Sequence, residues 1–244
     1  EMKITDVRME SYRWPSSGPS KTGRFVFCSD GADIIKIETD EGLAGVGMNW
    51  SVGAAGAIGR NIAAQFREVV IGMDPMDTEK IWDCMRGLDL GRRGIETRVM
   101  SGIDIAVWDI KGKACGEPIY KLLGGYTNRV PAYVSRGFRG QSLKDWAVSL
   151  ETGVSEGAHA IKMQIGGSPI NEDVARVKAA RALVGPDIKL MIDASTLYGH
   201  HEAIAVAKRI EEYDIFWLEE PVQVDDLRGY DLVAQATSIP IATG

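Results

Sequence analysis

The second half of the chain repeats one pattern, an apolar strand followed by an amphipathic helix, and this repeat limits the folds open to it. Apolar runs predict strands over 130–135, 159–164, 188–193, 214–219 and 239–243, and helical periodicity predicts helices over 143–156, 171–184, 201–212 and 225–236. Strands that alternate with helices pair in parallel through right-handed crossovers. A doubly wound sheet and a closed (β/α) barrel both satisfy this alternation.

Polar side chains end three of these strands. Lys162, Asp193 and Glu219 are each separated from the next by about 30 residues, the length of one strand–helix unit. Successive parallel strands would bring them to one rim of the sheet. Polar groups at strand ends favour the barrel. No strand is followed by a Gly-x-Gly-x-x-Gly motif, so the sequence does not support a dinucleotide-binding site. Each residue alone could cap a helix or form a surface ion pair, but their recurrence at one rim predicts a chemical site.

The first part of the chain predicts a separate α+β domain over residues 1–125, followed by the barrel part over 126–244. Apolar alternation predicts strands over 2–13, 32–39 and 43–50, and helical periodicity predicts helices over 54–70, 78–86 and 96–115. Gly42 supplies the positive φ that a hairpin turn over 40–42 needs. Residues 14–24, rich in Pro, Ser and Gly, predict a long loop.

Composition and charge narrow the class of function. The net charge of −6 disfavours nucleic acid or an anionic membrane surface as a partner, and no apolar run is long enough to span a membrane. The N-terminus lacks the apolar core of a signal peptide. The three cysteines, Cys28, Cys84 and Cys115, are widely spaced and predict reduced, mostly buried thiols in a cytoplasmic protein. We expect the protein to form a homo-oligomer. We also expect it to bind a small-molecule carboxylate substrate.

The predicted rim has the chemistry of a magnesium site. Mg²⁺ prefers hard oxygen ligands, which Asp193 and Glu219 would supply, and it accepts substrate oxygens as further ligands. A hydroxy-carboxylate bound there would lose its α-proton to give an enediolate that the metal charge stabilises. Lys162, one strand earlier, would contact the substrate carboxylate or act as an acid/base group.

The order of several motifs resembles the enolase superfamily, mandelate racemase subgroup. They run through nearly the whole chain: Asp40-Glu-Gly42, Gly72-Met-Asp-Pro75, Ser101 to Lys113 (SGIDIAVWDIKGK), Lys121 to Gly125 (KLLGG), Ile161 to Gly166 (IKMQIG), Ile192-Asp193 and Trp217 to Pro221 (WLEEP). This superfamily uses a Lys or His base with Mg²⁺. The resemblance implies an N-terminal α+β capping domain followed by a TIM-like (β/α)₇β barrel, with about its first five strands in this chain.

The same resemblance implies roles for the strand ends. Asp193 and Glu219 would be the first two Mg²⁺ ligands. The third would be a Glu directly after a strand ending like Ala242-Thr-Gly244, so we expect it just after Gly244.

One position departs from the family pattern. The usual second-strand motif is Lys-x-Lys, with its second Lys a base, whereas this chain has Lys162-Met-Gln164. An amide cannot take a proton at neutral pH, so a two-base racemisation loses one base. We therefore expect a one-base reaction, in which a His beyond Gly244 abstracts the α-proton and a β-hydroxyl leaves, as in dehydration of an acid sugar. A racemase or epimerase of a 2-hydroxy acid, and a non-catalytic member that binds anionic small molecules, remain the alternatives.

Four further residues are candidates for substrate binding. Gln164 can hydrogen-bond the substrate, and Ser195 lies two residues after Asp193, so its side chain should face the same site. Lys21 and Arg24 lie in the predicted loop that would close over the barrel mouth in this family. A helix cap for Ser195, and solvent exposure for the two basic residues, are the alternatives.

Overall fold

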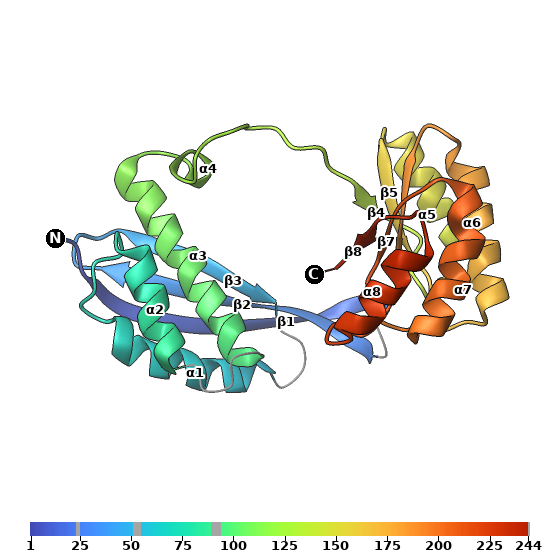
Figure 1. Ribbon diagram of the computed structural model, residues 1–244. Coiled ribbons are helices and arrows are strands. Elements are labelled where there is room, and N and C mark those ends of the chain that lie inside the picture. Colours follow the sequence, from blue (N-terminus) through green and yellow to red (C-terminus); the bar gives the residue numbers. More distant parts are fainter. Residues whose placement is uncertain (23–24, 51–54, 89–93, 244) are drawn as a thin grey trace. The chain divides into compact units, whose positions relative to one another are not determined.

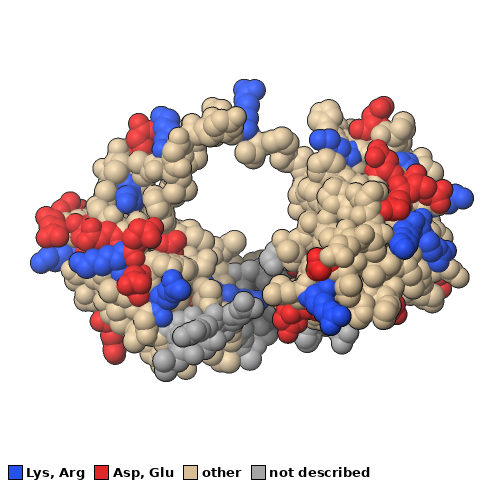
Figure 2. Space-filling model, in the orientation of Figure 1, with Lys and Arg blue, Asp and Glu red and all other residues tan. Residues whose placement is uncertain are grey.

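The computed structural model describes residues 1–22, 25–50, 55–88 and 94–243, with side chains over 1–15, 31–49, 56–88 and 94–243. The chain divides into two compact units (Figure 1). One comprises Glu1–Pro19 and Phe27–Arg129, and the other comprises Ser20–Val26 and Val130–Gly244. On the face shown in Figure 2, acidic and basic side chains are interspersed over each unit.

The first unit contains a three-stranded sheet in the order β1-β2-β3. Its strands are β1 (Ile4–Thr22), β2 (Phe25–Thr39) and β3 (Ala44–Trp50). The predicted hairpin turn joins β2 to β3, and Gly42 has a φ of +79° there. The loop predicted over residues 14–24 is wrong, because β1 continues to Thr22. β1 is an edge strand, where Pro15 and Pro19 are tolerated despite their missing N–H groups, and pairing with β2 outweighs the local turn signals.

Helices of the first unit pack on one another and on the sheet (Figure 1). They are α1 (Ala55–Val70), α2 (Thr78–Leu88), α3 (Ile95–Cys115) and the short α4 (Ile119–Leu122). Helix α3 lies directly against β3, because a Cβ on Gly45 or Gly47 would collide with backbone carbonyls of α3. The α+β character predicted for the first part is confirmed, and its core is built from the apolar faces of these elements, including Ile35, Ile37, Ile81, Met85, Ile103 and Ile110.

The second unit contains a five-stranded parallel sheet in sequential order. Its strands are β4 (Val134–Ser135), β5 (Ala160–Gln164), β6 (Lys189–Asp193), β7 (Ile215–Glu219) and β8 (Ile241–Ala242). The intervening helices are α5 (Leu143–Ser155), α6 (Ile170–Val184), α7 (His200–Ile210) with a 3-10 turn η1 (Glu211–Tyr213), and α8 (Leu227–Ala236). The predicted α/β alternation is confirmed, and these strands are consistent with the first five of a barrel.

Local capping fixes where several of these helices begin. The Ser142 side chain accepts a hydrogen bond from the Asp145 N–H at the start of α5, and Asp226 accepts one from the Gly229 N–H at the start of α8. Among the described residues, none of the helices combines the length and the apolar character needed to cross a bilayer.

Two further sequence expectations need correction. The first strand of the second unit was expected over 130–135, but only Val134 and Ser135 pair with β5. Pro131 lacks a donor for the ladder, and residues 130–133 are exposed. The thiols of Cys84 and Cys115 are exposed rather than buried, and the side chain of Cys28 lies outside the described residues. Cys84 is exposed because its neighbours Ile81 and Met85 form the buried face of α2.

Candidate metal and substrate site

Strand register places three polar side chains at the carboxyl end of the second sheet. Gln164 of β5 pairs with Asp193 of β6, and Asp193 pairs with Glu219 of β7. Side chains alternate between the two faces of a strand, so these three share one face. The opposite face is apolar and packs on the helices, through Ile161, Met163, Leu190, Ile192 and Leu218. The sheet therefore presents two carboxylates and an amide in one row.

Lys162 lies one layer below this row. It pairs in register with Met191, which pairs with Trp217, so these residues are two positions before the strand ends. Lys162 meets the carboxylates as predicted. Its backbone lies two residues before the end of β5, and its long side chain extends to the two acids.

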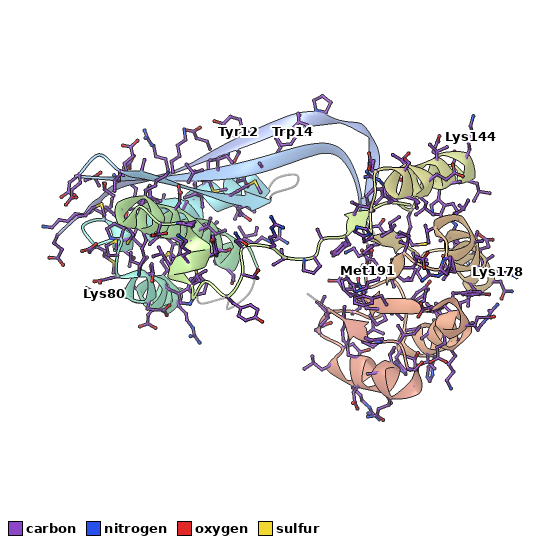
Figure 3. The ribbon with its side chains drawn as sticks, turned by 90° about the horizontal axis from the view of Figure 1, so that it is seen from above. Tyr12, Trp14, Lys80, Lys144, Lys178 and Met191 are labelled. Carbon is purple, nitrogen blue, oxygen red and sulfur yellow. The ribbon has the colours of Figure 1, made fainter. Side chains whose placement is uncertain are left out.

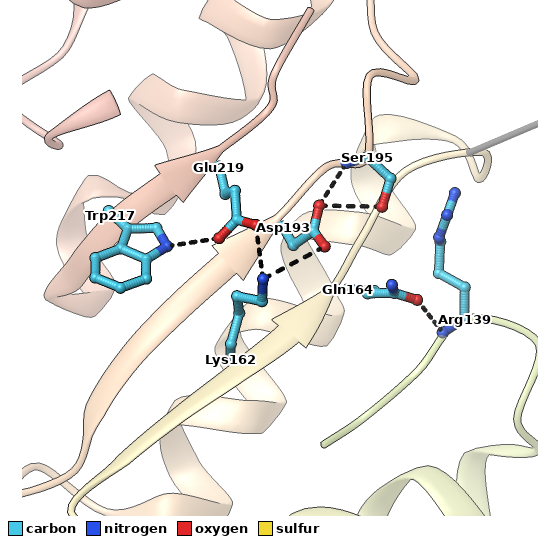
Figure 4. A network of polar contacts seen from close by, with 7 residues as sticks. All are labelled: Arg139, Lys162, Gln164, Asp193, Ser195, Trp217 and Glu219. Atoms are coloured by element: carbon cyan, nitrogen blue, oxygen red, sulfur yellow. Dashed lines mark hydrogen bonds and ion pairs between the residues drawn. The ribbon is translucent and has the colours of Figure 1, made fainter. Parts of the chain in front are cut away.

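The ammonium of Lys162 lies between the two carboxylates (Figure 4). Its Nζ is 2.6 Å from Glu219 Oε1 and 3.9 Å from Asp193 Oδ2. It also lies 5.3 Å from the centre of the Tyr133 ring, whose electron-rich face attracts a cation. Burial lowers the pKa of Lys162, but the hydrogen bond and the negative charges of Glu219 and Asp193 outweigh burial. The pKa is therefore raised, and the amine is a charged group rather than a ready base.

The second oxygen of each carboxylate is held by a hydrogen bond. Asp193 Oδ1 accepts from the Ser195 backbone N–H at 2.7 Å and from the Ser195 hydroxyl at 3.0 Å. Glu219 Oε2 accepts from Trp217 Nε1 at 3.1 Å. The carboxylates are thus oriented with Oδ2 and Oε1 toward the same cation, as Figure 4 shows. Such supporting hydrogen bonds are typical of metal-binding carboxylates.

Backbone strain accompanies this arrangement just beyond the strands. Ser195, Thr196 and Glu220 have φ values of +46°, +60° and +44°. Non-glycine residues adopt this region at a cost and usually where the surrounding structure enforces it. Here the Thr196 N–H donates to the Glu220 carbonyl at 2.8 Å, which ties the two strained segments together. The turns that follow Asp193 and Glu219 therefore stabilise each other.

Two of the four predicted substrate-binding residues lie at this site, and the side chains of the other two are outside the described residues. Gln164 lies on the rim, where its Oε1 accepts from the Arg139 N–H at 3.4 Å, and Ser195 is buried against Asp193. The side chain of Lys21 and the whole of Arg24 lie outside the described residues. Sequence reasoning missed Tyr133, Trp217 and Arg139. Trp217 could have been found, since it precedes Glu219 by two residues and so shares its face.

The donor set fits a hard divalent cation. Two carboxylates from adjacent strands, each with one oxygen already hydrogen-bonded, face a point where a positive charge now lies. Oxygen ligands of this kind are those that Mg²⁺ prefers. Within the described part of the chain, no three His, Cys, Asp or Glu side chains group closely enough to hold a metal. Asp193 and Glu219 are therefore the two carboxylates of this rim that could hold such an ion.

An α+β domain followed by parallel β/α units, with two acids on neighbouring strand ends, defines the class of enolase-like proteins. Residues 4–124 match the family described as mandelate racemase/muconate lactonizing enzyme, N-terminal domain, and residues 145–244 match the enolase C-terminal domain-like family. The chain belongs to the enolase superfamily, in its mandelate racemase subgroup, as the sequence motifs predicted.

The relatives of this chain include dehydratases, cycloisomerases, an epimerase and a racemase. Arabinonate dehydratase of Saccharolobus solfataricus is 36% identical over 214 residues, which are 85% of this chain and 57% of that protein. D-galactarolactone cycloisomerase of Agrobacterium fabrum is 36% identical over 249 residues, covering 100% of this chain and 65% of that protein. The chain therefore spans about three fifths of the length of these relatives.

Solved structures show the same likeness. L-talarate/galactarate dehydratase from Salmonella typhimurium LT2 superposes with a TM-score of 0.92 at 29% identity, and the match covers 100% of this chain and 64% of that one. A mutant of that enzyme has been solved with Mg and L-glucarate. A racemase from Streptomyces coelicolor A3(2), solved with bound magnesium, gives a TM-score of 0.89 at 32% identity, over 99% of this chain and 69% of that one.

Proposed function

We propose that the full-length protein is a magnesium-dependent lyase that removes the α-proton of a hydroxy-carboxylate and dehydrates a sugar acid. The observation that carries this proposal is the pair of oriented carboxylates, Asp193 and Glu219, around a single cationic position. Three of the relatives named as dehydratases act on sugar acids, arabinonate, L-talarate/galactarate and D-galactonate, and favour the same reaction.

Asp193 and Glu219 would hold Mg²⁺, with Ser195 and Trp217 fixing their orientation. When bound, the ion would supply positive charge that stabilises the substrate carboxylate as it gains electron density. Mg²⁺ would also replace the ammonium of Lys162 between the two acids, which releases Lys162 toward the substrate. The ammonium of Lys162, which now donates to Glu219, would then bind the substrate carboxylate as a cation.

Gln164 favours dehydration over racemisation. Racemisation needs a base on each face of the α-carbon, whereas elimination needs only one. Gln164 stands in the same row as the acids and can only donate and accept hydrogen bonds. Its Oε1 already accepts from the Arg139 N–H, so its NH₂ group is the part left to contact the substrate.

The proposed reaction balances without a further reagent. A base takes the α-proton, the C–O bond at the β-carbon breaks, and the hydroxide leaves with a proton as water. The enol that remains becomes a 2-keto-3-deoxy acid. From the family resemblance, the abstracting base is a His in the part of the relatives' length that this chain does not span.

An isomerase is the second candidate. D-galactarolactone cycloisomerase matches the whole of this chain, and N-succinyl-L-Arg/Lys racemase of Bacillus cereus is 30% identical over 98% of it. A racemase would return a proton to the α-carbon and keep the β-hydroxyl, whereas a dehydratase loses that hydroxyl as water, so the products separate the two reactions. A non-catalytic protein would bind sugar acids without either change.

The test incubates the full-length protein with Mg²⁺ and a panel of sugar acids in heavy water. We expect a 2-keto-3-deoxy product, detected by its carbonyl chemistry, for at least one acid. Epimerised substrate carrying deuterium would instead favour the isomerase, and no exchange with any acid would contradict α-proton abstraction altogether.

Asp193→Asn tests the metal assignment. We expect it to abolish Mg²⁺-dependent turnover, because an amide is a poor ligand for Mg²⁺ and the site loses a negative charge. Asp187→Asn is the matched control, since Asp187 is exposed just before the other end of β6. Full activity in Asp193→Asn would show that this carboxylate is not a metal ligand.

A further inference from the structure

The loop after β4 brings an arginine to the same rim. The Arg139 backbone N–H donates to Gln164 Oε1, and its half-buried side chain runs beside Gln164 toward the end of β6 (Figure 4). The guanidinium lies over the loop after β5, where a Cβ on Gly167 would be 4.0 Å from Arg139 Nη1. The guanidinium therefore lies beside the loop that directly follows Gln164.

A buried carboxylate lies in the helix that follows this loop. Asp173, in the first turn of α6, is 1% exposed, and its Oδ2 accepts from the hydroxyl of Tyr198 at 2.7 Å. Tyr198 is itself only 6% exposed. Asp173 Oδ1 is buried without a hydrogen-bond partner among the described residues. A buried negative charge with one oxygen unpaired is costly unless a positive charge lies near it.

The guanidinium of Arg139 is a positive charge that interacts with Asp173. Burial lowers the pKa of the Arg139 guanidinium, and the negative charges of Asp193 and then Asp173 act in the opposite direction. The guanidinium therefore interacts electrostatically with the carboxylates of both Asp193 and Asp173. An arginine remains charged in a protein even when partly buried.

We propose that Arg139 binds the second carboxylate of a sugar diacid, and that Asp173 and Tyr198 are the residues that position it. The inference rests on the proposed function and names its substrate class. Lys162 lies between the metal-site acids and would meet the carboxylate next to the reacting carbon. Arg139 is a second cation on the same rim, and its planar fork matches a carboxylate with two parallel hydrogen bonds. A monoacid would place an uncharged hydroxyl there.

The experiment compares acids that differ only at the far end. Galactarate and galactonate, and glucarate and gluconate, share their carbon skeletons and differ in a terminal carboxylate or hydroxymethyl group. With the full-length protein and Mg²⁺, we expect kcat/KM for a diacid to exceed that for its matched monoacid by about 10- to 100-fold, the range that hydrogen bonds to a charged group supply.

Variants of Arg139 assign this preference. Arg139→Met should lower kcat/KM for diacids by about the same 10- to 100-fold and leave the values for monoacids nearly unchanged. Arg139→Lys keeps the charge without the fork and should give an intermediate loss. Arg136→Met is the control from the same loop, since Arg136 is engaged with Glu156 at 2.6 Å, and it should keep the full preference.

Tyr198→Phe tests the positioning role. Without the hydroxyl, Asp173 loses its hydrogen bond, and we expect its charge to attract the guanidinium away from the substrate. KM for diacids should then rise with kcat unchanged, and the values for monoacids should not move. A purely structural role would lower the activity toward both kinds of acid together. Mg²⁺ titration followed by tryptophan fluorescence shows independently that each variant retains the metal site.

Two failures are distinguishable. If no acid of either kind is converted or exchanged, the proposed function is wrong, and with it this inference. If monoacids are converted as well as diacids, or if Arg139→Met lowers both equally, the inference about Arg139 is overturned while the proposed function stands.

Discussion

Lys162→Met is the change whose consequences the structure defines most sharply. The Nζ of Lys162 is the cation that the structure places between Asp193 and Glu219. Met has a similar length and fills the same volume without charge. The substitution therefore leaves two carboxylates on adjacent strands facing each other without a positive charge between them.

The distances set the size of the effect. At an effective dielectric constant of about 20, unit charges separated by the 2.6 Å to Glu219 attract by roughly 6 kcal/mol, and at the 3.9 Å to Asp193 by roughly 4 kcal/mol. Desolvation of the three groups offsets most of this attraction. Breaking a buried ion pair by removing one partner costs about 3–5 kcal/mol. The side chains here are 14%, 13% and 23% exposed, so we expect the lower end, about 3 kcal/mol, in the free energy of unfolding.

Magnesium should reverse this loss. In the parent protein Mg²⁺ has to displace the ammonium, whereas in Lys162→Met it meets two uncompensated carboxylates. The variant should therefore bind Mg²⁺ more tightly than the parent. At a concentration of 100 times the dissociation constant, a ligand specific to the folded state adds about 2.7 kcal/mol, which is close to the whole deficit.

The assay is urea unfolding of both proteins with and without Mg²⁺, with the metal affinity read from tryptophan fluorescence. Trp217 donates to Glu219 Oε2, so its indole should report the binding event. Lys178→Met is the control, because Lys178 projects from the outer side of α6 (Figure 3) and is exposed, and it should change the free energy of unfolding by less than about 0.5 kcal/mol. If Lys162→Met without Mg²⁺ is as stable as the parent, the ammonium does not stabilise these carboxylates. If Mg²⁺ stabilises both proteins equally, Lys162 and the metal do not compete for them.

Three further predictions concern stability. The Arg181 guanidinium donates to four backbone carbonyls near the amino ends of β6 and β7, so Arg181→Lys should lower the free energy of unfolding by about 2–3 kcal/mol without changing Mg²⁺ affinity; an unchanged urea midpoint would contradict this. Gly47→Ala drives a Cβ into the Gly102 carbonyl of α3 and should cost about 1–3 kcal/mol or more, seen as a lower melting temperature, whereas a neutral result would mean that α3 can shift from β3. Hydrogen bonds from Thr237 and Ser238 hold the pKa of Glu211 below its ordinary value of 4.5, so this carboxylate stabilises the fold above pH 4.5 and the stabilisation is lost as pH falls through the lower folded pKa. Thr237→Val should therefore shift acid unfolding to higher pH, and an unchanged acid midpoint would remove the role of this hydrogen bond.

Hydrophobic periodicity was sufficient to locate most elements. The helices of both units begin and end within a few residues of the predicted bounds, because amphipathic periodicity and capping residues are local properties of the sequence. The errors arose where pairing between segments outweighed local signals. Residues 14–22 look like a loop but continue a strand along β2, and residues 130–133 look like a strand but have no pairing partner on β5.

The rim of the site was predictable only in part. The sequence indicated Asp193 and Glu219 because they end successive apolar strands, and it placed Ser195 beside Asp193 by alternation. The roles of these residues, and of Lys162 and Gln164, remain predictions until the variants are measured. Arg139, Tyr133 and the pair of Asp173 with Tyr198 carried no sequence signal, since each lies in a loop, helix or strand edge whose neighbours are distant in sequence.

The sequence by itself determined the class of fold, the family and the two acids at the strand ends, because these follow from periodicity and from short contiguous motifs. Only the tertiary structure decided that Lys162 lies one layer below the acids and reaches up between them, and which oxygen of each acid is held by Ser195 or Trp217. It alone brought Arg139 to Gln164 on the same rim. The physical reason is that charge, burial and side-chain reach act through space, between residues that the order of the chain keeps apart.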